Sequence, residues 1–137
     1  MEHFRTAHAE AGGVVSFIGQ VRGETEPDPV EALYLEAHPT LTESGIEAAI
    51  TKTRGRFNIL GLDVAHRTGL IPVGETIVYI ATAARHRRDA FLAADFMMDY
   101  LKTEAIFWKR EHRASGTHWI EPRAKDYKDA ERWQNLA

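Results

Sequence analysis

The chain has 137 residues, 44% of them hydrophobic and 27% charged, with a formal net charge of −3 and no cysteine. This composition is typical of one globular domain and excludes disordered, collagen-like and coiled-coil chains. The net negative charge argues against a nucleic-acid-binding surface. The absence of cysteine excludes disulfides, thiolate nucleophiles and cysteine-based metal sites, so any sulfur chemistry must use sulfur that arrives on another molecule.

Neither a membrane span nor a secretory signal is expected. Apolar runs such as residues 76–84 are short, whereas a membrane-spanning helix needs about 20 apolar residues. No apolar stretch follows residues 1–5, so the expected compartment is the cytosol. We expect residues 1–137 to form a single domain with a polar C-terminal tail over residues 124–137.

The first half of the chain alternates strand patterns with glycine- and proline-containing loops. Thr40 and Glu43 have the spacing of a capping box, in which a hydroxyl and a carboxylate satisfy two unpaired amide groups at a helix start. In chain order the patterns predict a strand over 14–18, a loop over 19–29, a strand over 30–37, a helix from this box to about residue 56 and a strand over 58–66.

The second half contains the two clearest elements. Residues 75–84 are apolar on both faces, which predicts a strand in the centre of a sheet. Residues 89–103 predict a helix whose apolar stripe consists of Phe91, Ala94, Met98 and Leu101. We further predict a turn over 69–74, an extended segment over 106–112 and a weakly helical tail over 124–136. A turn over 115–117 leads into a strand over 118–121, which is expected to pair back as a hairpin. Two helices among such strands indicate an α+β domain with a largely antiparallel sheet.

Basic residues gather in two parts of this weakly acidic chain, which favours a local anion-binding site. Residues 85–88 lie where the central strand meets the helix start, whose unpaired amide groups and positive dipole end attract phosphate or carboxylate. The alternative is a solvated charged turn.

Three further cations could contribute to such a site. Lys102 closes the amphipathic helix, and Lys109 follows two aromatic residues that lower the local dielectric around an ammonium group. Arg22 follows the first strand and can reach over the end of the sheet. The alternative for each is an ordinary surface residue. None of the seven histidines has the helical spacing of a zinc site, so we expect no metal.

Longer stretches resemble the signature of the large subunit of molybdopterin synthase. That family typically reads M-D-Y-L-K-T and then P-F-W-K-R-E or similar, and residues 98–103 and 106–111 resemble these two parts. The match runs from about residue 12 to residue 121 in consistent order. Further segments that resemble the family are residues 15–22, 35–39, 66–69, 72–75 and 86–91.

The resemblance implies an α/β hammerhead-like fold with a mostly antiparallel sheet and two main helices. It also implies a homodimer of large subunits with a small ubiquitin-like subunit at each end, whose C-terminal thiocarboxylate enters a pocket of the large subunit. The implied reaction places two sulfurs on cyclic pyranopterin monophosphate and makes the dithiolene of molybdopterin, in molybdenum cofactor biosynthesis. No cofactor or metal is implied, and neither nucleic acid nor membrane is an expected partner.

The resemblance assigns roles to individual residues. Lys102 matches the family's essential lysine and is expected to hold the thiocarboxylate or the developing anion, while Lys109 assists as a general acid or electrostatic group. Gln20 stands where many relatives carry lysine, which predicts one weaker phosphate contact. The expected substrate-binding residues are Gln20, Val21, Arg22, His86, Arg87, Lys102, Lys109, Arg110 and Glu111.

Two other functions are compatible with the residues alone. One is a non-catalytic anion- or nucleotide-binding module that keeps this fold, which predicts phosphate binding without turnover. The other is a small phosphate-ester enzyme with His86 as acid or base, which predicts activity without a thiocarboxylated partner. The joint presence of Lys102, Lys109 and Arg22 favours the synthase over both.

Overall fold

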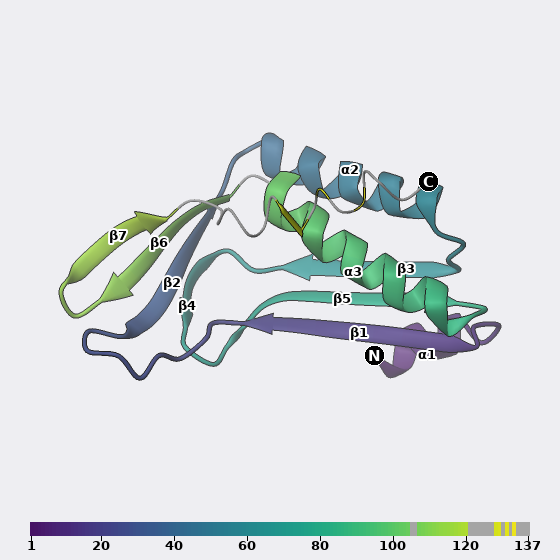
Figure 1. The fold of residues 1–137 in the computed structure, drawn as a ribbon, viewed down its shortest axis with the longest axis horizontal. Coiled ribbons are helices and arrows are strands. Elements are labelled where there is room, and N and C mark those ends of the chain that lie inside the picture. The colour runs from purple at the N-terminus through teal and green to yellow at the C-terminus, as the bar shows by residue number, and fades with distance from the viewer. Residues whose placement is uncertain (105–106, 121–127, 130, 132, 134–137) are drawn as a thin grey trace.

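Two antiparallel sheets, two long helices and a short N-terminal helix make up the described part of the chain (Figure 1). The computed structural model describes residues 1–104, 107–120, 128, 129, 131 and 133. The helices are α1 (Glu2–Ala7), α2 (Leu41–Arg56) and α3 (Arg87–Glu104). The strands are β1 (Gly13–Gln20), β2 (Val30–Ala37), β3 (Gly61–His66), β4 (Gly69–Pro72), β5 (Thr76–Ala84), β6 (Phe107–Arg113) and β7 (Gly116–Ile120).

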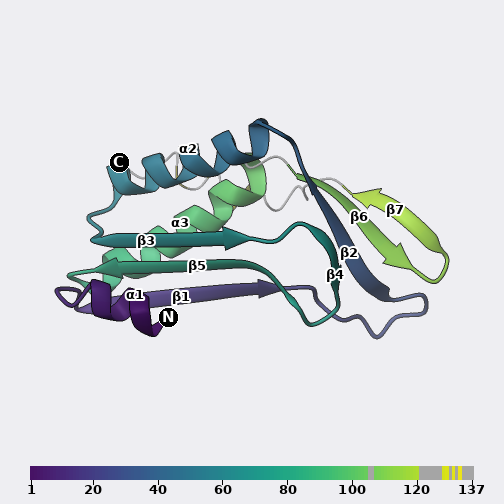
Figure 2. The same ribbon diagram turned by 180° about the vertical axis from the view of Figure 1, so that it is seen from behind.

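The strands form two sheets that meet end to end. The first sheet has the strand order β1-β5-β3 and the second has the order β4-β2-β6-β7. Every strand pairing in the described residues is antiparallel. Helices α2 and α3 cover one face of the first sheet and α1 lies on the other, while the β6–β7 hairpin projects away from the helices (Figures 1 and 2). The expected α+β class with two main helices is therefore confirmed.

The main core lies between β5 and the two long helices. Val78 and Ile80 of β5 pack with Met97 and Leu101 of α3 and with Ala49 of α2. Ile80, Met97 and Ala49 have no exposed surface. The prediction of a central buried strand is confirmed, because β5 is paired on both sides and covered on this face.

Small side chains let the elements around β5 approach closely. On the face opposite the long helices, Ala81 and Ala83 pack against Phe4 of α1. Toward α3, the Thr82 hydroxyl donates a hydrogen bond of 2.7 Å to the carbonyl oxygen of Ala90, and both residues are fully buried. This bond satisfies a buried hydroxyl and fixes the first turns of α3 against the strand.

The start of α2 differs from the predicted capping box. The Thr40 side chain makes no cap hydrogen bond. Instead, the His38 ring Nδ1 accepts hydrogen bonds from the backbone amides of Thr40 (3.2 Å) and Leu41 (3.0 Å), and the Thr42 hydroxyl oxygen accepts one from the His38 amide. The prediction is wrong because the His38 ring nitrogen, two residues upstream, takes the Thr40 amide, from which the Glu43 carboxylate of a capping box would accept a hydrogen bond. It takes the Leu41 amide as well.

The buried face of α3 is rotated from the predicted stripe. Phe91 was expected to belong to it but is 61% exposed, whereas Ala94 and Leu101 are buried as predicted. The other buried hydrophobic residues of this helix are Ala90, Ala93, Phe96 and Met97. Small alanines mark the side in contact with β5, and a stripe chosen by large side chains does not detect them.

Three other short elements differ from prediction. The turn predicted over 69–74 is wrong in its first part, because Gly69–Pro72 forms β4 and pairs with β2. A proline is tolerated there because β4 is an edge strand. Helix α1 was not predicted, and β3 begins at Gly61, three residues later than expected.

The predicted hairpin near the C-terminus is confirmed, since β6 and β7 pair antiparallel. Ile106, Glu121 and most of the tail over 124–136 lie outside the described residues. Of that tail, Trp133 is buried, and its indole Nε1 donates a hydrogen bond of 2.6 Å to the Asp99 carboxylate of α3. No helix in the described ranges is long and apolar enough to cross a membrane.

The corrected face of α3 can be tested by stability. Met97→Ala removes a fully buried side chain and should lower the free energy of unfolding by about 2–5 kcal/mol. Phe91→Ala, on the exposed side of the same helix, should change it by no more than about 0.5 kcal/mol. Urea unfolding followed by circular dichroism measures both, and a comparable loss in the two variants would contradict the assignment.

Candidate active site

A cavity of about 360 Å³ lies where the first sheet meets the second, at the C-terminal end of α3. Its walls come from β1, β3, β5, α3, β6 and β7, so segments distant in sequence build it together. Most of the lining is apolar, with two lysines, one glutamine and one histidine among it. The lining residues are Phe17, Ile18, Gly19, Gln20, His66, Ile77, Val78, Met98, Leu101, Lys102, Phe107, Lys109 and Ile120.

Lys102 and Lys109, the two predicted catalytic residues, line this one cavity. Lys102 lies in the last turn of α3, where the helix dipole favours a cation. Lys109 lies in β6 opposite Leu35 of β2, and it is half-buried. Because the surrounding walls are apolar, an anion that enters the cavity interacts more strongly with these ammonium groups than it would in water.

His66 is a cavity residue to which the sequence analysis assigned no role. Its ring stacks on Phe107 with centroids 4.0 Å apart, and its Nδ1 makes a hydrogen bond of 2.9 Å with the carbonyl of Arg67. Since a carbonyl only accepts, Nδ1 is the donor and Nε2 is left as the acceptor of the neutral ring. Burial lowers the pKa of His66, and the nearby Lys109 charge lowers it further, against the opposing effect of the Arg67 hydrogen bond.

The three expected binding residues at the end of β1 and directly after it have different surroundings. Gln20 lines the cavity. The Val21 side chain is buried with Val30, Leu35 and Ile71, and its amide and carbonyl are hydrogen-bonded to backbone groups of the turn between β4 and β5. The next residue, Arg22, is exposed at the start of the loop over residues 21–29.

Arg110 and Glu111, also expected to bind substrate, do not line the cavity. Arg110 neighbours Lys109 on β6 and therefore points to the opposite face of the sheet. There its guanidinium lies between the rings of Tyr34 (4.4 Å) and Trp119 (4.8 Å). The Glu111 carboxylate accepts a hydrogen bond of 3.0 Å from Nε of Arg113.

His86 and Arg87 lie at the other end of α3. They are exposed beside the first residue of β1, where a side chain on Gly13 would contact Arg87. Fifteen residues of helix separate Arg87 from Lys102, which corresponds to about 22 Å. One copy of the chain therefore does not bring His86 and Arg87 to the cavity that holds the lysines.

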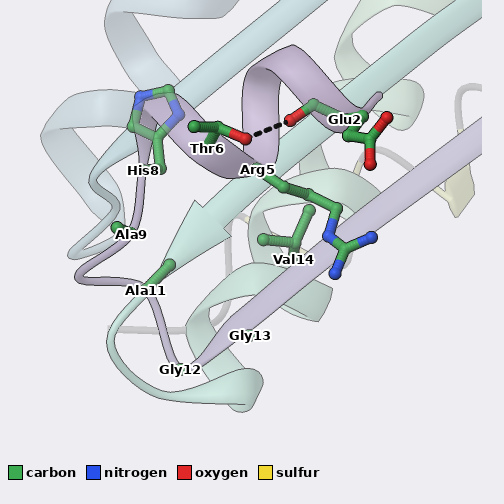
Figure 3. Close-up of a pocket in the computed structure, with 9 residues that line it drawn as sticks. All are labelled: Glu2, Arg5, Thr6, His8, Ala9, Ala11, Gly12, Gly13 and Val14. Atoms are coloured by element: carbon green, nitrogen blue, oxygen red, sulfur yellow. Dashed lines mark hydrogen bonds between the residues drawn. The ribbon is translucent and has the colours of Figure 1, made fainter.

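A second cavity, of about 520 Å³, lies between α1 and the start of β1 (Figure 3). Glu2 and Arg5 of α1 line it with opposite charges, and the Thr6 hydroxyl donates a hydrogen bond of 2.9 Å to the Glu2 carbonyl. None of the predicted site residues lines this cavity. Within the described parts of the chain, no three histidine or acidic side chains come together as a metal site.

Comparison with known proteins identifies the family of this chain. The family model described as "MoaE protein" matches residues 1–104. The molybdopterin synthase catalytic subunit of Caulobacter vibrioides is 46% identical over 134 residues, which cover 98% of this chain and 88% of that protein. The corresponding subunit of Escherichia coli K12 is 42% identical, with 90% of this chain and 83% of that protein covered.

Solved structures give the same result. A molybdopterin biosynthesis MoaE protein from Burkholderia ambifaria superposes with a TM-score of 0.79 and 36% identity, covering 97% of this chain and 87% of that one. Molybdopterin synthase from Staphylococcus aureus superposes with a TM-score of 0.79 and 26% identity, covering 88% and 89%. The fold and the sequence thus define a molybdopterin-biosynthesis protein. This chain belongs to the MoaE family, in which the relatives named above are catalytic subunits of molybdopterin synthase.

The protonation of His66 gives a test of the cavity's environment. We expect a His66 pKa below its ordinary value of 6.5, measured by NMR titration, because burial and Lys109 disfavour the charged ring. Lys109→Met should raise this pKa, whereas Arg54→Met on α2 should leave it unchanged. Since the folded state then binds this proton less readily than the unfolded chain, His66 makes stability fall as pH drops below about 6.5. A His66 pKa of 6.5 or higher would contradict the geometry.

Proposed function

We propose that this chain is the catalytic subunit of a molybdopterin synthase. It transfers sulfur from the thiocarboxylated C-terminus of a small ubiquitin-like subunit to cyclic pyranopterin monophosphate, and so forms the dithiolene of molybdopterin. The observation that carries the proposal is the single apolar cavity lined by both Lys102 and Lys109. Membership of the MoaE family supports it independently.

The cavity suits the chemistry of a thiocarboxylated tail. A thiocarboxylate is an anion, and release of its sulfur from the terminal carbonyl carbon passes through an oxyanion. An ammonium group within hydrogen-bonding distance stabilises that charge, and a largely apolar site strengthens the effect because it excludes water. Lys102 holds the thiocarboxylate or the developing oxyanion, and Lys109 acts as a general acid or an electrostatic group.

The apolar walls of the cavity also suit the carbon atoms of a peptide tail. Phe17, Met98 and Phe107 supply apolar walls. Gly19 lies against Val78 of β5, and a Cβ there would come within 2.7 Å of the valine side chain. Gly19 is thus closely packed against β5 in the wall of the cavity, and a larger residue at this position would displace the Val78 side chain.

A homodimer brings His86 and Arg87 of one copy to the lysines of the other, although they lie a helix length apart within one copy. Strand β1 is an edge strand that runs from Gly13, beside Arg87, to Gln20 at the cavity, and Phe17 and Ile18 on it are 41% and 56% exposed. A twofold axis that lies beside β1 and perpendicular to it reverses the strand direction in the second copy. The Arg87 end of one copy then lies beside the cavity of the other, so that His86 and Arg87 bind the substrate phosphate across the interface.

The reaction is tested by reconstituted turnover. Purified protein is mixed with thiocarboxylated small subunit and cyclic pyranopterin monophosphate, and the dithiolene product is followed as its oxidised fluorescent derivative. Lys102→Ala should lower the rate by about 10²–10³-fold, the usual loss for one donor to an oxyanion. A normal rate in this variant would refute the assigned role. A folded wild-type protein that binds the small subunit and phosphate ligands without making product would favour the non-catalytic module instead.

The composite site is tested by mixing two inactive variants. Lys102→Ala and Arg87→Ala are unfolded together and refolded, so that mixed dimers form. A mixed dimer has one cavity with both residues intact and one with neither, and half of randomly assembled dimers are mixed. Activity should therefore recover to about a quarter of the wild-type value. No recovery from dimers shown to be mixed would mean that Arg87 does not serve the partner's cavity.

A further inference from the structure

Arg113, the last residue of β6, joins the loop over residues 21–29 to the β6–β7 hairpin. Its Nη1 donates hydrogen bonds to the Glu24 carboxylate (3.0 Å) and to the Asp28 carbonyl (2.7 Å). Its Nε and Nη2 donate to the Glu111 carboxylate. The Arg113, Glu24 and Glu111 side chains are only 22%, 24% and 18% exposed, whereas the surface pair of Arg67 and Glu75 is 46% and 48% exposed. The Arg113 contacts thus differ in kind from a solvated ion pair.

The same loop is held at a second point. The Ser115 amide donates a hydrogen bond of 3.0 Å to the Asp28 carboxylate, and the Ser115 hydroxyl donates to the other carboxylate oxygen. Asp28 has a φ of 58°, a left-handed conformation that a non-glycine residue adopts at some cost. Hydrogen bonds from Ser115 lower the pKa of Asp28, and the Arg113 hydrogen bond lowers that of Glu24.

Hydrogen bonds hold the chain on both sides of Arg22. On one side, the backbone of Val21 is hydrogen-bonded to Gly74 and Glu75. On the other side, Glu24 is held by Arg113 and also accepts a hydrogen bond of 3.3 Å from the Val30 amide. The exposed Arg22 side chain therefore projects from a backbone that is fixed before and after it.

The same arginine compensates the negative charge of Glu111. Lys109, Glu111 and Arg113 alternate along β6 and share one face of the strand. With Arg113 in place, this row carries a net positive charge and the carboxylate is neutralised. Without it, Glu111 would present an uncompensated negative charge two residues from Lys109 and would repel an anionic ligand.

We propose that Arg113 is a positioning residue for the phosphate of the substrate: it holds the Arg22 segment against β6 and neutralises Glu111 beside Lys109. The proposal rests on the proposed function and extends it, because the sequence analysis gave no role to Arg113, Glu24 or Asp28. Arg113 acts through Arg22 and Glu111 and need not itself touch the substrate.

The test uses the full-length chain with its small subunit and three variants. Arg113→Ala removes the contacts, and Arg113→Lys keeps the charge but loses the forked geometry. Arg54→Ala removes one charge from the last turn of α2, and that end of the helix lies away from the hairpin (Figure 1). Calorimetry measures the Kd for cyclic pyranopterin monophosphate, and steady-state kinetics give a KM for each of the two substrates. Hydrogen exchange measures the exchange rates of the backbone amides of residues 21–29. Thermal unfolding shows whether each variant is folded.

Arg113→Ala should raise the Kd and KM for the pyranopterin by about tenfold, the loss expected for one misplaced charged contact, while the KM for the small subunit changes by less than about twofold. Exchange over residues 21–29 should increase. Arg113→Lys should recover part of the affinity through the retained charge, and Arg54→Ala should behave as the wild type in every measurement.

Wild-type pyranopterin affinity in Arg113→Ala would overturn the proposal. An equal rise in both KM values with unchanged exchange over residues 21–29 would overturn it too, because that pattern indicates a general structural defect. A wild-type protein that binds the pyranopterin but makes no product would refute the proposed function. In that case, the Kd and the amide exchange of Arg113→Ala, compared with those of the wild type, still decide the role of Arg113. A wild-type protein that binds no pyranopterin would refute both.

Discussion

The packing of α3 across β5 decides where the cavity lined by Lys102 and Lys109 lies. Met97 and Leu101 contact Val78 and Ile80, and the hydrogen bond from Thr82 to the Ala90 carbonyl fixes the helix at its other end. With the helix held along the strand, its last turn reaches the end of the first sheet, where the second sheet begins. The cavity lies at that junction, and Lys102 enters it from the helix.

The second sheet completes the site through its register. Strand β6 pairs with β2 so that Lys109 lies opposite Leu35, and the alternation of side chains turns Phe107 and Lys109 toward the cavity. The same alternation sends Arg110 to the other face, between two aromatic rings. A one-residue shift would exchange these two cations, because side chains on a strand change faces at every residue.

Two ionisable groups near the lysines add no uncompensated negative charge. His66 is kept neutral by burial and by the lysine beside it, so it adds a hydrogen-bond acceptor and no charge at neutral pH. Glu111 is compensated by Arg113 within the same strand. The result is a cationic, largely apolar pocket for two anionic reactants, in which the only described carboxylate on that face of β6 has a positive partner.

Much of the fold could be predicted from local sequence patterns. The bounds of β2 were predicted without error, β5 and α3 were predicted to within a few residues, and the hairpin of β6 and β7 followed from its turn. These elements are visible because alternation along a strand and spacing along a helix depend only on neighbouring residues. Prediction failed where an unexpected partner mattered. The His38 ring, and not a capping box of Thr40 and Glu43, binds the first amides of α2. Packing on β5 rotated the buried face of α3 away from Phe91.

The sequence by itself determined the α+β class, because alternation along strands and spacing along helices are local patterns. Its resemblance to a known family then indicated the family and drew attention to Lys102 and Lys109. Only the tertiary structure decided which cations share one cavity. Lys102 and Lys109 meet there because α3 ends at the sheet that carries β6, while His86 and Arg87 lie a full helix length away. His66 and Arg113 acquire their surroundings from pairings between segments far apart in the chain, and no local spacing encodes such pairings.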